Sequence, residues 1–284
     1  MINLEKFNSV IPEDEDGFVI EEADPFFIEK RQFIRHYLKV FSGTMKRKFN
    51  YLVYIDMFSG SGLKRLQNGQ ITCGSPSLAF ANKDPFSKYI FCEEDQARCD
   101  ALRIRLNKNC RKENIAIFNG DPNKLVEKIA YYLPDSSKRH KVAALCLIDP
   151  KTLEIEFNTI RLLSELGVHF LVILDFPWTK ENAFHQCIDE EREHLNDFIG
   201  EPWSNIEKET TIKSNDQFFR NLAKTYHRNI RSLGYISQGS FHESEVEGLN
   251  LKHIFVGYYT HTNGIRKIGA DALRVVTPQV TLFD

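Results

Sequence analysis

Hydrophobic and polar positions follow two different periods along most of this chain. Short runs rich in β-branched and aromatic residues, typical of strands, alternate with stretches that repeat apolar residues every three or four positions, typical of amphipathic helices. Strands separated by helical stretches imply right-handed βαβ units and a parallel sheet. The runs that predict strands are Tyr51–Asp56, Lys88–Glu93, Asn114–Asn119, Val142–Ile148 and Val168–Leu174.

Helical periodicity begins at Pro25 and continues through Phe41, with Gly43 as the expected stop signal. Further helices are expected at 96–108, 124–133, the C-terminal half of 153–166, and 216–233. After the last helix, 234–244 and 251–260 are predicted to form an antiparallel hairpin, because the link between them is too short for a crossover helix.

Two segments do not follow this alternation of strands and helices. Residues 1–24 are polar and acidic and are expected to form an arm or a surface strap, whereas 178–214 is a charged insertion expected to cap the sheet. The remainder, 25–284, is expected to be one domain. The prediction is an α/β, Rossmann-like fold with a mostly parallel seven-stranded sheet and a C-terminal antiparallel hairpin, which is the strand pattern of class I methyltransferases.

Composition narrows the class of protein. The chain has 284 residues and a net charge of -2, so its overall charge does not indicate nucleic-acid binding. A local basic patch is still compatible with the sequence, because Lys46-Arg47-Lys48 could contact phosphates or simply be solvated. The six cysteines include no C-x-x-C pair, and no apolar run is long enough for a signal peptide or a membrane span, so a cytoplasmic location without a membrane partner is expected.

The strongest local signal is the block Tyr54-Ile55-Asp56-Met57-Phe58-Ser59-Gly60-Ser61-Gly62, in which a strand delivers a carboxylate into a tight glycine turn. Gly60 and Gly62 would let backbone approach a ligand closely, and the N–H groups after the turn can bind a carboxylate or phosphate. Asp56 could serve the ammonium group of methionine. The block therefore favours S-adenosylmethionine, bound through Asp56, Phe58, Ser59, Gly60 and Gly62; the alternative is a glycine turn with an aspartate cap.

Two further acids follow strands in register with this turn. Glu93 could accept hydrogen bonds from both ribose hydroxyls of an adenosyl group. Glu94 or Asp95, which follow it, could take this role instead. Asp121 could accept from the adenine amino group; the alternative is a turn with Pro122 at the first helical position.

Asp149 ends the fourth strand and is the candidate substrate-facing carboxylate. Amino methyltransferases of DNA and RNA often carry Asp-Pro-Pro-Tyr there, whereas Lys151-Thr152 follows Asp149-Pro150 here, so no aromatic is available to stack on a flipped base. Phe176 and Trp178 could wall a pocket or pack beneath the insertion. No metal site is expected, because the spacing of His185, Cys187 and His194 matches no common zinc site.

Several of these blocks resemble a known family, the three-Cys-motif partner proteins (TcmP) of bacteria. The resemblance comprises the opening helix with Lys30 and Tyr37-Leu38, the glycine-turn block, Gly74-Ser75-Pro76, Phe91-Cys92-Glu93, Ile148-Asp149-Pro150, Asp175-Phe176-Pro177 and the stretch Tyr258–Gly264. It implies a methyltransferase-like fold and a protein partner that carries three cysteines. The chain departs from the family at Lys151-Thr152, where an aromatic-glycine pair is usual.

Three functions are compatible with these observations. The first is an S-adenosylmethionine-dependent methyltransferase that acts on nucleic acid or protein. The second is a non-catalytic Rossmann module that binds a protein or nucleic acid in a defence or modification system. The third is a metal-dependent nucleic-acid-processing enzyme that uses Asp149 and Glu93.

Overall fold

The computed structural model describes residues 16–24, 26–107, 114–176, 183–207, 212, 214–237, 242–245 and 253–260. They fall into two compact units, residues 16–147 and residues 148–260. Pro177, Trp178 and the stretch 261–264 of the sequence analysis lie outside the described residues.

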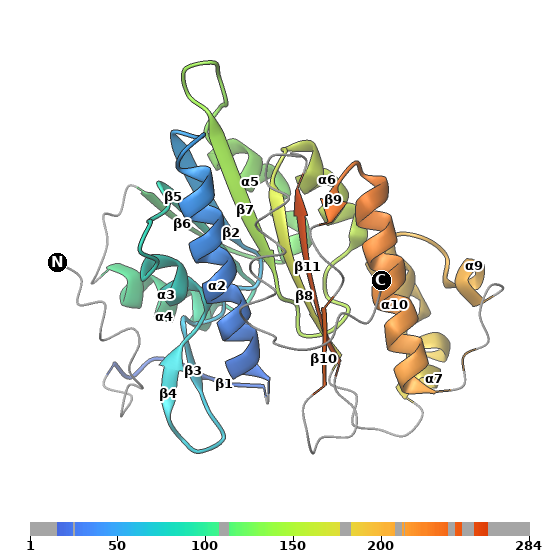
Figure 1. Ribbon diagram of the computed structural model, residues 1–284. Helices are drawn as coiled ribbons and strands as arrows, with labels where there is room; N and C mark the ends of the chain where they lie inside the picture. Colours follow the sequence, from blue (N-terminus) through green and yellow to red (C-terminus); the bar gives the residue numbers. More distant parts are fainter. Residues whose placement is uncertain are drawn as a thin grey trace. The chain divides into compact units, whose positions relative to one another are not determined.

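The first unit is built on parallel strands in the order β7-β2-β5-β6 (Figure 1). The α/β architecture with a mostly parallel sheet is thereby confirmed. Within the described residues these strands are β2 (Tyr51–Asp56), β5 (Lys88–Glu93), β6 (Ile115–Asn119) and β7 (Val142–Ile148). All four coincide with runs predicted from the hydrophobic pattern.

Helices of the first unit are α2 (Phe27–Met45), α3 (Ser75–Phe80), α4 (Gln96–Asn107) and α5 (Val126–Tyr132), with a 3-10 turn η2 (Pro122–Lys124) before α5. The expected stop at Gly43 is wrong. Helix α2 continues because Ser42 and Met45 are both fully buried on its inner face. Burial of a methionine side chain, worth about 1.5–3 kcal/mol, exceeds the cost of about 1 kcal/mol for a glycine in a helix.

A second, small sheet in the first unit was not expected. Strands β3 (Leu63–Arg65) and β4 (Ile71–Cys73) form a hairpin directly after the glycine turn, and β1 (Glu21–Glu22) pairs in parallel with β3. Figure 1 shows these strands below α2 and α3. In the described part of the N-terminal segment, residues 16–24, Glu21 and Glu22 are fixed on this hairpin, and we call residues 16–24 the strap.

The strands of the second unit pair with one another in antiparallel fashion. Strand β8 (His169–Asp175) pairs with β11 (His253–Thr260), and β11 also pairs with β10 (His242–Glu245) and β9 (Ile236–Ser237). The C-terminal hairpin is thus correct in outline, but the strand expected at 234–244 is two separate strands. The seven-strand count is accordingly only approximate.

The helices of the second unit are α6 (Phe157–Glu165), α7 (Ala183–Asp189), α8 (Arg192–Ile199), α9 (Trp203–Glu207) and α10 (Asn215–Ser232). The expected insertion thus contains short helices in its described part, and its capping role stays a prediction. Over the described ranges, no helix combines the length and apolarity needed to cross a membrane.

Candidate functional site

Three strand ends meet at one edge of the parallel sheet. Asp56 is paired with Phe91 across β2 and β5, and Glu93 is paired with Asn119 across β5 and β6. Since parallel strands deliver their carboxyl ends to the same edge, the structure brings Asp56, Glu93 and the residues that follow Asn119 together. This edge is where ligands bind in open α/β sheets.

Asp56 is fully buried and shapes the start of the turn. The Tyr54 hydroxyl donates to its Oδ2 at 3.0 Å, and the Phe58 N–H donates to Oδ1 at 3.3 Å. A buried carboxylate requires such partners. The ring of Tyr54 is itself held in an aromatic cluster, 5.5 Å from the ring of Phe86.

The glycine turn adopts a conformation that side chains disfavour. Gly60 and Gly62 have φ angles of 64° and 84°. Ser59 fixes the turn to the neighbouring strand, since its N–H and its hydroxyl each donate to the Cys92 carbonyl at 3.0 Å. A Cβ atom at Gly60 would lie 2.3 Å from Glu21 Oε2, and one at Gly62 would lie 3.0 Å from Leu102 Cδ1. The space that each glycine leaves is therefore taken by a side chain of the same unit.

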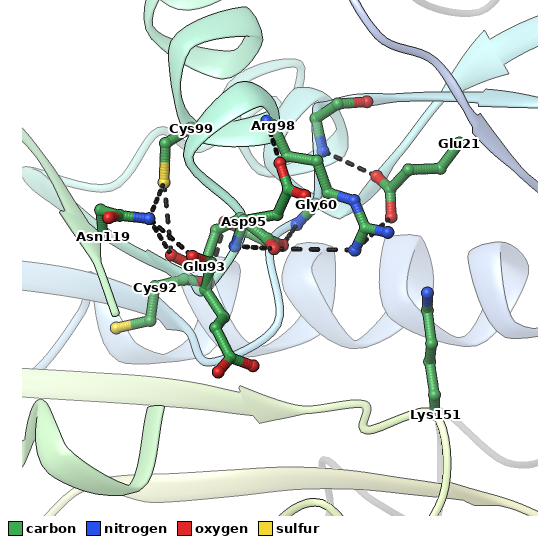
Figure 2. A network of polar contacts seen from close by, with 12 residues as sticks. Glu21, Gly60, Cys92, Glu93, Asp95, Arg98, Cys99, Asn119 and Lys151 are labelled. Carbon is green, nitrogen blue, oxygen red and sulfur yellow. Dashed lines mark hydrogen bonds and ion pairs between the residues drawn. The ribbon is translucent and has the colours of Figure 1, made fainter. Parts of the chain in front are cut away.

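Two carboxylates bind the N–H groups of this turn. The Gly60 N–H donates to Glu93 Oε2 at 2.9 Å, and the Ser61 N–H donates to Glu21 Oε2 at 2.7 Å. The Lys64 ammonium binds Glu21 Oε1 at 2.9 Å. Figure 2 shows the Arg98 guanidinium between the two acids, 3.4 Å from Glu21 Oε1 and 3.6 Å from Glu93 Oε1. The turn is thus an anion-binding site for carboxylates.

The two acids have opposite pKa shifts. Burial raises the pKa of Glu93 above its usual value, and the charge of Glu21 adds to this effect. Burial acts in the same direction on Glu21, but Lys64, the Ser61 N–H and Arg98 together hold the pKa of Glu21 below its usual value. Glu93 is therefore the member of the pair that takes up a proton first as the pH falls.

The structure assigns different positions to the three consecutive acids 93–95. Glu93 is buried at the strand end and accepts from the Asp95 N–H at 2.9 Å, whereas Glu94 is exposed. Asp95 accepts from the Arg98 N–H at 2.9 Å and thereby caps α4. Of the three, Glu93 is the acid that lies against the glycine turn.

The end of β6 is fixed to Glu93 by hydrogen bonds to the Glu93 main-chain carbonyl, of which the one from Asn119 comes from its side-chain amide. The Gly120 N–H donates to the Glu93 carbonyl at 3.0 Å, and the Asn119 amide donates to the same oxygen at 3.2 Å. Figure 2 shows the Asn119 amide together with Cys99, whose thiol also donates to that carbonyl. Asp121 follows and accepts from the Asn123 N–H at 2.9 Å, so it caps η2. The capping alternative therefore holds for Asp121, and its adenine contact stays a prediction.

Sequence reasoning missed Glu21, Arg98 and Arg105. Arg105 donates to the Ser61 carbonyl at 2.8 Å and to Asp16 Oδ2 at 2.8 Å, so it ties the N-terminal strap to the glycine turn. Glu21 and Asp16 lie in an acidic segment without periodicity, and nothing in that segment indicates which acid returns to the turn. Lys64 carried a weak signal, because a cation directly after a glycine turn is placed to bind an anion.

The remaining candidates lie in the second unit. Asp149 follows β7 and is half-buried. Phe176 is buried and stacks on Phe219, with ring centroids 5.0 Å apart, so it packs within the fold rather than walling a pocket. Nowhere in the described ranges do three or more His, Cys, Asp or Glu side chains form a group suited to a metal ion.

Comparisons with known proteins support the fold. No family model matches the chain. No curated protein matches it either. The structure is similar to that of Trm1 from Pyrococcus horikoshii in complex with S-adenosyl-L-methionine, with a TM-score of 0.51 and 12% identity over 93% of this chain and 62% of that one.

Two further structures are similar at lower scores. Protein LPL1258 from Legionella pneumophila has a TM-score of 0.47 and 12% identity over 87% of this chain and 92% of its own. The N-terminal domain of human METTL16, in complex with SAH, has a TM-score of 0.45 and 12% identity over 91% and 78%. The chain spans less than two thirds of Trm1, and at 12% identity the likeness shows the fold alone.

Proposed function

We propose that this chain binds S-adenosylmethionine at its glycine turn and transfers the methyl group to an acceptor. The observation that carries the proposal is Glu93, a buried carboxylate at the end of the second parallel strand, 2.9 Å from the Gly60 N–H. The fold supports it, because the Trm1 structure that the chain resembles holds S-adenosyl-L-methionine.

The residues present have the chemistry that this cofactor needs, and its carboxylate would bind at the turn in exchange for the Glu21 carboxylate that occupies the site. A carboxylate has about four lone-pair positions, so Glu93 keeps acceptors for ribose hydroxyls beside the two N–H groups that it already binds. The site formed by the Ser61 N–H, Lys64 and Arg98 holds the Glu21 carboxylate, which has the same chemistry as the carboxylate of methionine. Asp56 would act through the shape of the turn, since it is fully buried, and Asp121 would meet the adenine amino group.

Methyl transfer requires little else from the protein. The bound cofactor supplies a methyl group on a positively charged sulfur, and the chain must hold that group in line with an acceptor and exclude water. Asp149 is the residue proposed to orient the acceptor or to take up its proton. Strands β2 and β7 end in register, with Asp56 paired to Leu147, and Asp149 follows two residues later along the chain.

Calorimetry with S-adenosylmethionine and S-adenosylhomocysteine tests the binding step. Dissociation constants below about 100 µM, or about -5.5 kcal/mol, are expected. If the heat measured at millimolar ligand equals the heat of diluting the ligand into buffer, the proposal is refuted.

Asp149→Asn is expected to lower methyl transfer at least 100-fold and to change cofactor affinity less than twofold, because a general base contributes roughly 10²–10⁴-fold. The measurement is tritium transfer from labelled S-adenosylmethionine to total cellular RNA, DNA and protein. Asp197→Asn, an exposed aspartate on α8, is the control and should keep full activity. An Asp149→Asn variant as active as this control would dismiss the role of Asp149.

Cofactor affinity is expected to fall as the pH is lowered from 7 to 5. The raised pKa of Glu93 means that its neutral form persists to a higher pH than for an ordinary glutamate. Only the charged form accepts strongly from two hydroxyls, so binding is strong above the pKa and weak below it. Titrations at several pH values check this; an affinity that is constant over the range would show that Glu93 does not bind the ribose.

The resemblance to three-Cys-motif partner proteins bears on the acceptor. It suggests that the acceptor, or a protein that presents it, is supplied by a cysteine-containing partner or by a nucleic acid. Lys151-Thr152 favours a second candidate function, a non-catalytic module, because the aromatic residue that usually follows this strand is absent. Cofactor binding without label transfer to any fraction would favour that module.

A further inference from the structure

The sheet edge opposite the glycine turn collects positive charge in the first unit. Strands β2, β5 and β7 begin there, and the segments that precede them are residues 46–50 after α2, the loop 81–87 and the loop 134–141. Residues 46–48 read Lys-Arg-Lys and residues 138–141 read Lys-Arg-His-Lys. These two basic runs are separated by about ninety residues of sequence, so the charge concentration is a product of the fold.

Main-chain contacts hold the two runs side by side. The Asn50 and Tyr51 N–H groups donate to the Lys141 carbonyl at 2.9 and 3.1 Å, and the Lys141 N–H donates to Asn50 Oδ1 at 3.2 Å. The third loop is joined to them, because Lys46 forms an ion pair with Asp84 and the Leu52 N–H binds the Ser87 hydroxyl. We name the surface formed by 46–48, 83, 88 and 138–141 the basic edge.

The charges of the basic edge other than that of the half-buried Lys88 are exposed and mostly unneutralised. Residues 46–48, Lys83 and 138–141 are all exposed, and the only carboxylates in the three described segments are Asp84 and Asp135. Apart from Lys46, no side chain of the two runs has a carboxylate within ion-pair distance in the part of the chain that the structure describes. The whole chain carries a net charge of -2, so this surplus is local.

An aromatic groove adjoins these cations. The Lys88 ammonium donates to the Tyr132 carbonyl at 2.9 Å and lies 4.1 Å from the centre of the Tyr132 ring. Next to it, Phe118, Lys128, Tyr131 and Tyr132, with Glu127, line a cavity of about 370 Å³. Tyr131 is 92% exposed, which is unusual for so large an aromatic side chain and leaves its ring free to stack on a planar group.

We propose that the basic edge binds the phosphate backbone of single-stranded nucleic acid, with Tyr131 stacking on a base. Cations interleaved with exposed aromatic rings are the combination that recognises single strands. A lipid surface fits less well, because Tyr131 is the only exposed large hydrophobic residue in this region of the described chain and a bilayer requires apolar anchors. Binding here does not depend on a cofactor at the glycine turn.

The test uses the full chain without cofactor and a fluorescein-labelled single-stranded RNA of mixed sequence. Anisotropy titrations at 50–200 mM salt should give micromolar binding that weakens with salt. The variant Lys138→Glu with Arg139→Glu should bind at least tenfold more weakly, and the slope of log K against log salt should decrease by about 1.4 if two phosphate contacts are lost. The control, Lys224→Glu with Arg231→Glu on the exposed side of α10, makes the same charge change and should bind within twofold of the unchanged chain.

Tyr131→Ala separates stacking from charge. It should weaken binding of the single strand about tenfold, since one base–aromatic stack is worth roughly 1–3 kcal/mol, and leave the salt slope unchanged. The proposal is overturned if the unchanged chain binds no RNA at 50 mM salt, if the two charge reversals act alike, or if vesicles containing anionic lipid bind and the RNA does not. A chain that binds RNA here but takes up no S-adenosylmethionine would support the basic edge and refute only the cofactor proposal.

Discussion

Gly60→Ala should destabilise the chain by about 2–4 kcal/mol. The φ angle of 64° costs a non-glycine residue roughly 1–2 kcal/mol. In addition, the new Cβ would lie 2.3 Å from Glu21 Oε2. The Glu21 carboxylate cannot turn aside without losing the Ser61 N–H, Lys64 and Arg98, so the steric conflict is resolved only by breaking those contacts.

Urea denaturation of four variants, namely Gly60→Ala, Gly69→Ala, Glu21→Ala and Gly60→Ala with Glu21→Ala, isolates the two contributions. Gly69 has a φ angle of 80° and open space around its Cβ position, so Gly69→Ala should show the backbone cost alone. Adding Glu21→Ala to Gly60→Ala removes the conflict, so the combined change should cost less than the sum of the two single changes. A Gly60→Ala variant no less stable than Gly69→Ala would mean that Glu21 does not lie against the turn as described.

Glu93→Gln is expected to weaken S-adenosylmethionine binding by 100-fold or more. One oxygen of Glu93 accepts from the Gly60 N–H and the other from the Asp95 N–H, and both would be needed to hold a ribose between turn and strand. In glutamine one of these oxygens becomes an NH₂ group, which faces an N–H donor and has no acceptor. Hydrogen bonds to a charged group are worth about 1.5–3 kcal/mol each, and the variant loses one acceptor oxygen and, with the charge, the strength of the bonds to the other, which together account for the expected factor.

Glu94→Gln is the matched control, because Glu94 is the adjacent acid, is exposed, and lies outside the turn contacts. Its cofactor affinity should stay within twofold of the unchanged chain. Calorimetry measures binding, and the melting temperature shows that each variant is folded. Equal affinities for the two variants would move the ribose site away from Glu93 and leave the fold as the only support for a cofactor.

The Glu21 carboxylate fills the anion-binding site at the glycine turn. Glu21 is a carboxylate of the chain itself, and it satisfies the Ser61 N–H and neutralises Lys64 and Arg98. Without it, two cations and a buried donor would face each other at an unfavourable cost. The strap thus stabilises a site whose charges would otherwise repel.

Local sequence alone determined the four parallel strands of the first unit. Runs such as Leu52–Ile55 and Val142–Ile148 are almost wholly apolar or aromatic because both faces of these strands are covered, and that requirement is visible in the residues themselves. Glu93 was also correctly placed at a strand end beside Asp56, because parallel strands end at one edge. Those predictions needed no knowledge of distant contacts.

Tertiary structure decided the rest of the site. Strands β1, β3 and β4 have two or three residues each and show no period, so they form only because they pair with one another, and the sequence offers no sign of them. Likewise, the choice of Glu21 among the acids of the N-terminal arm depends on a contact forty residues away, and the basic edge depends on the pairing of β2 with β7. Periodicity reflects how a residue contacts its neighbours in sequence, whereas these contacts join segments far apart in sequence that come together in space only once the sheet has formed.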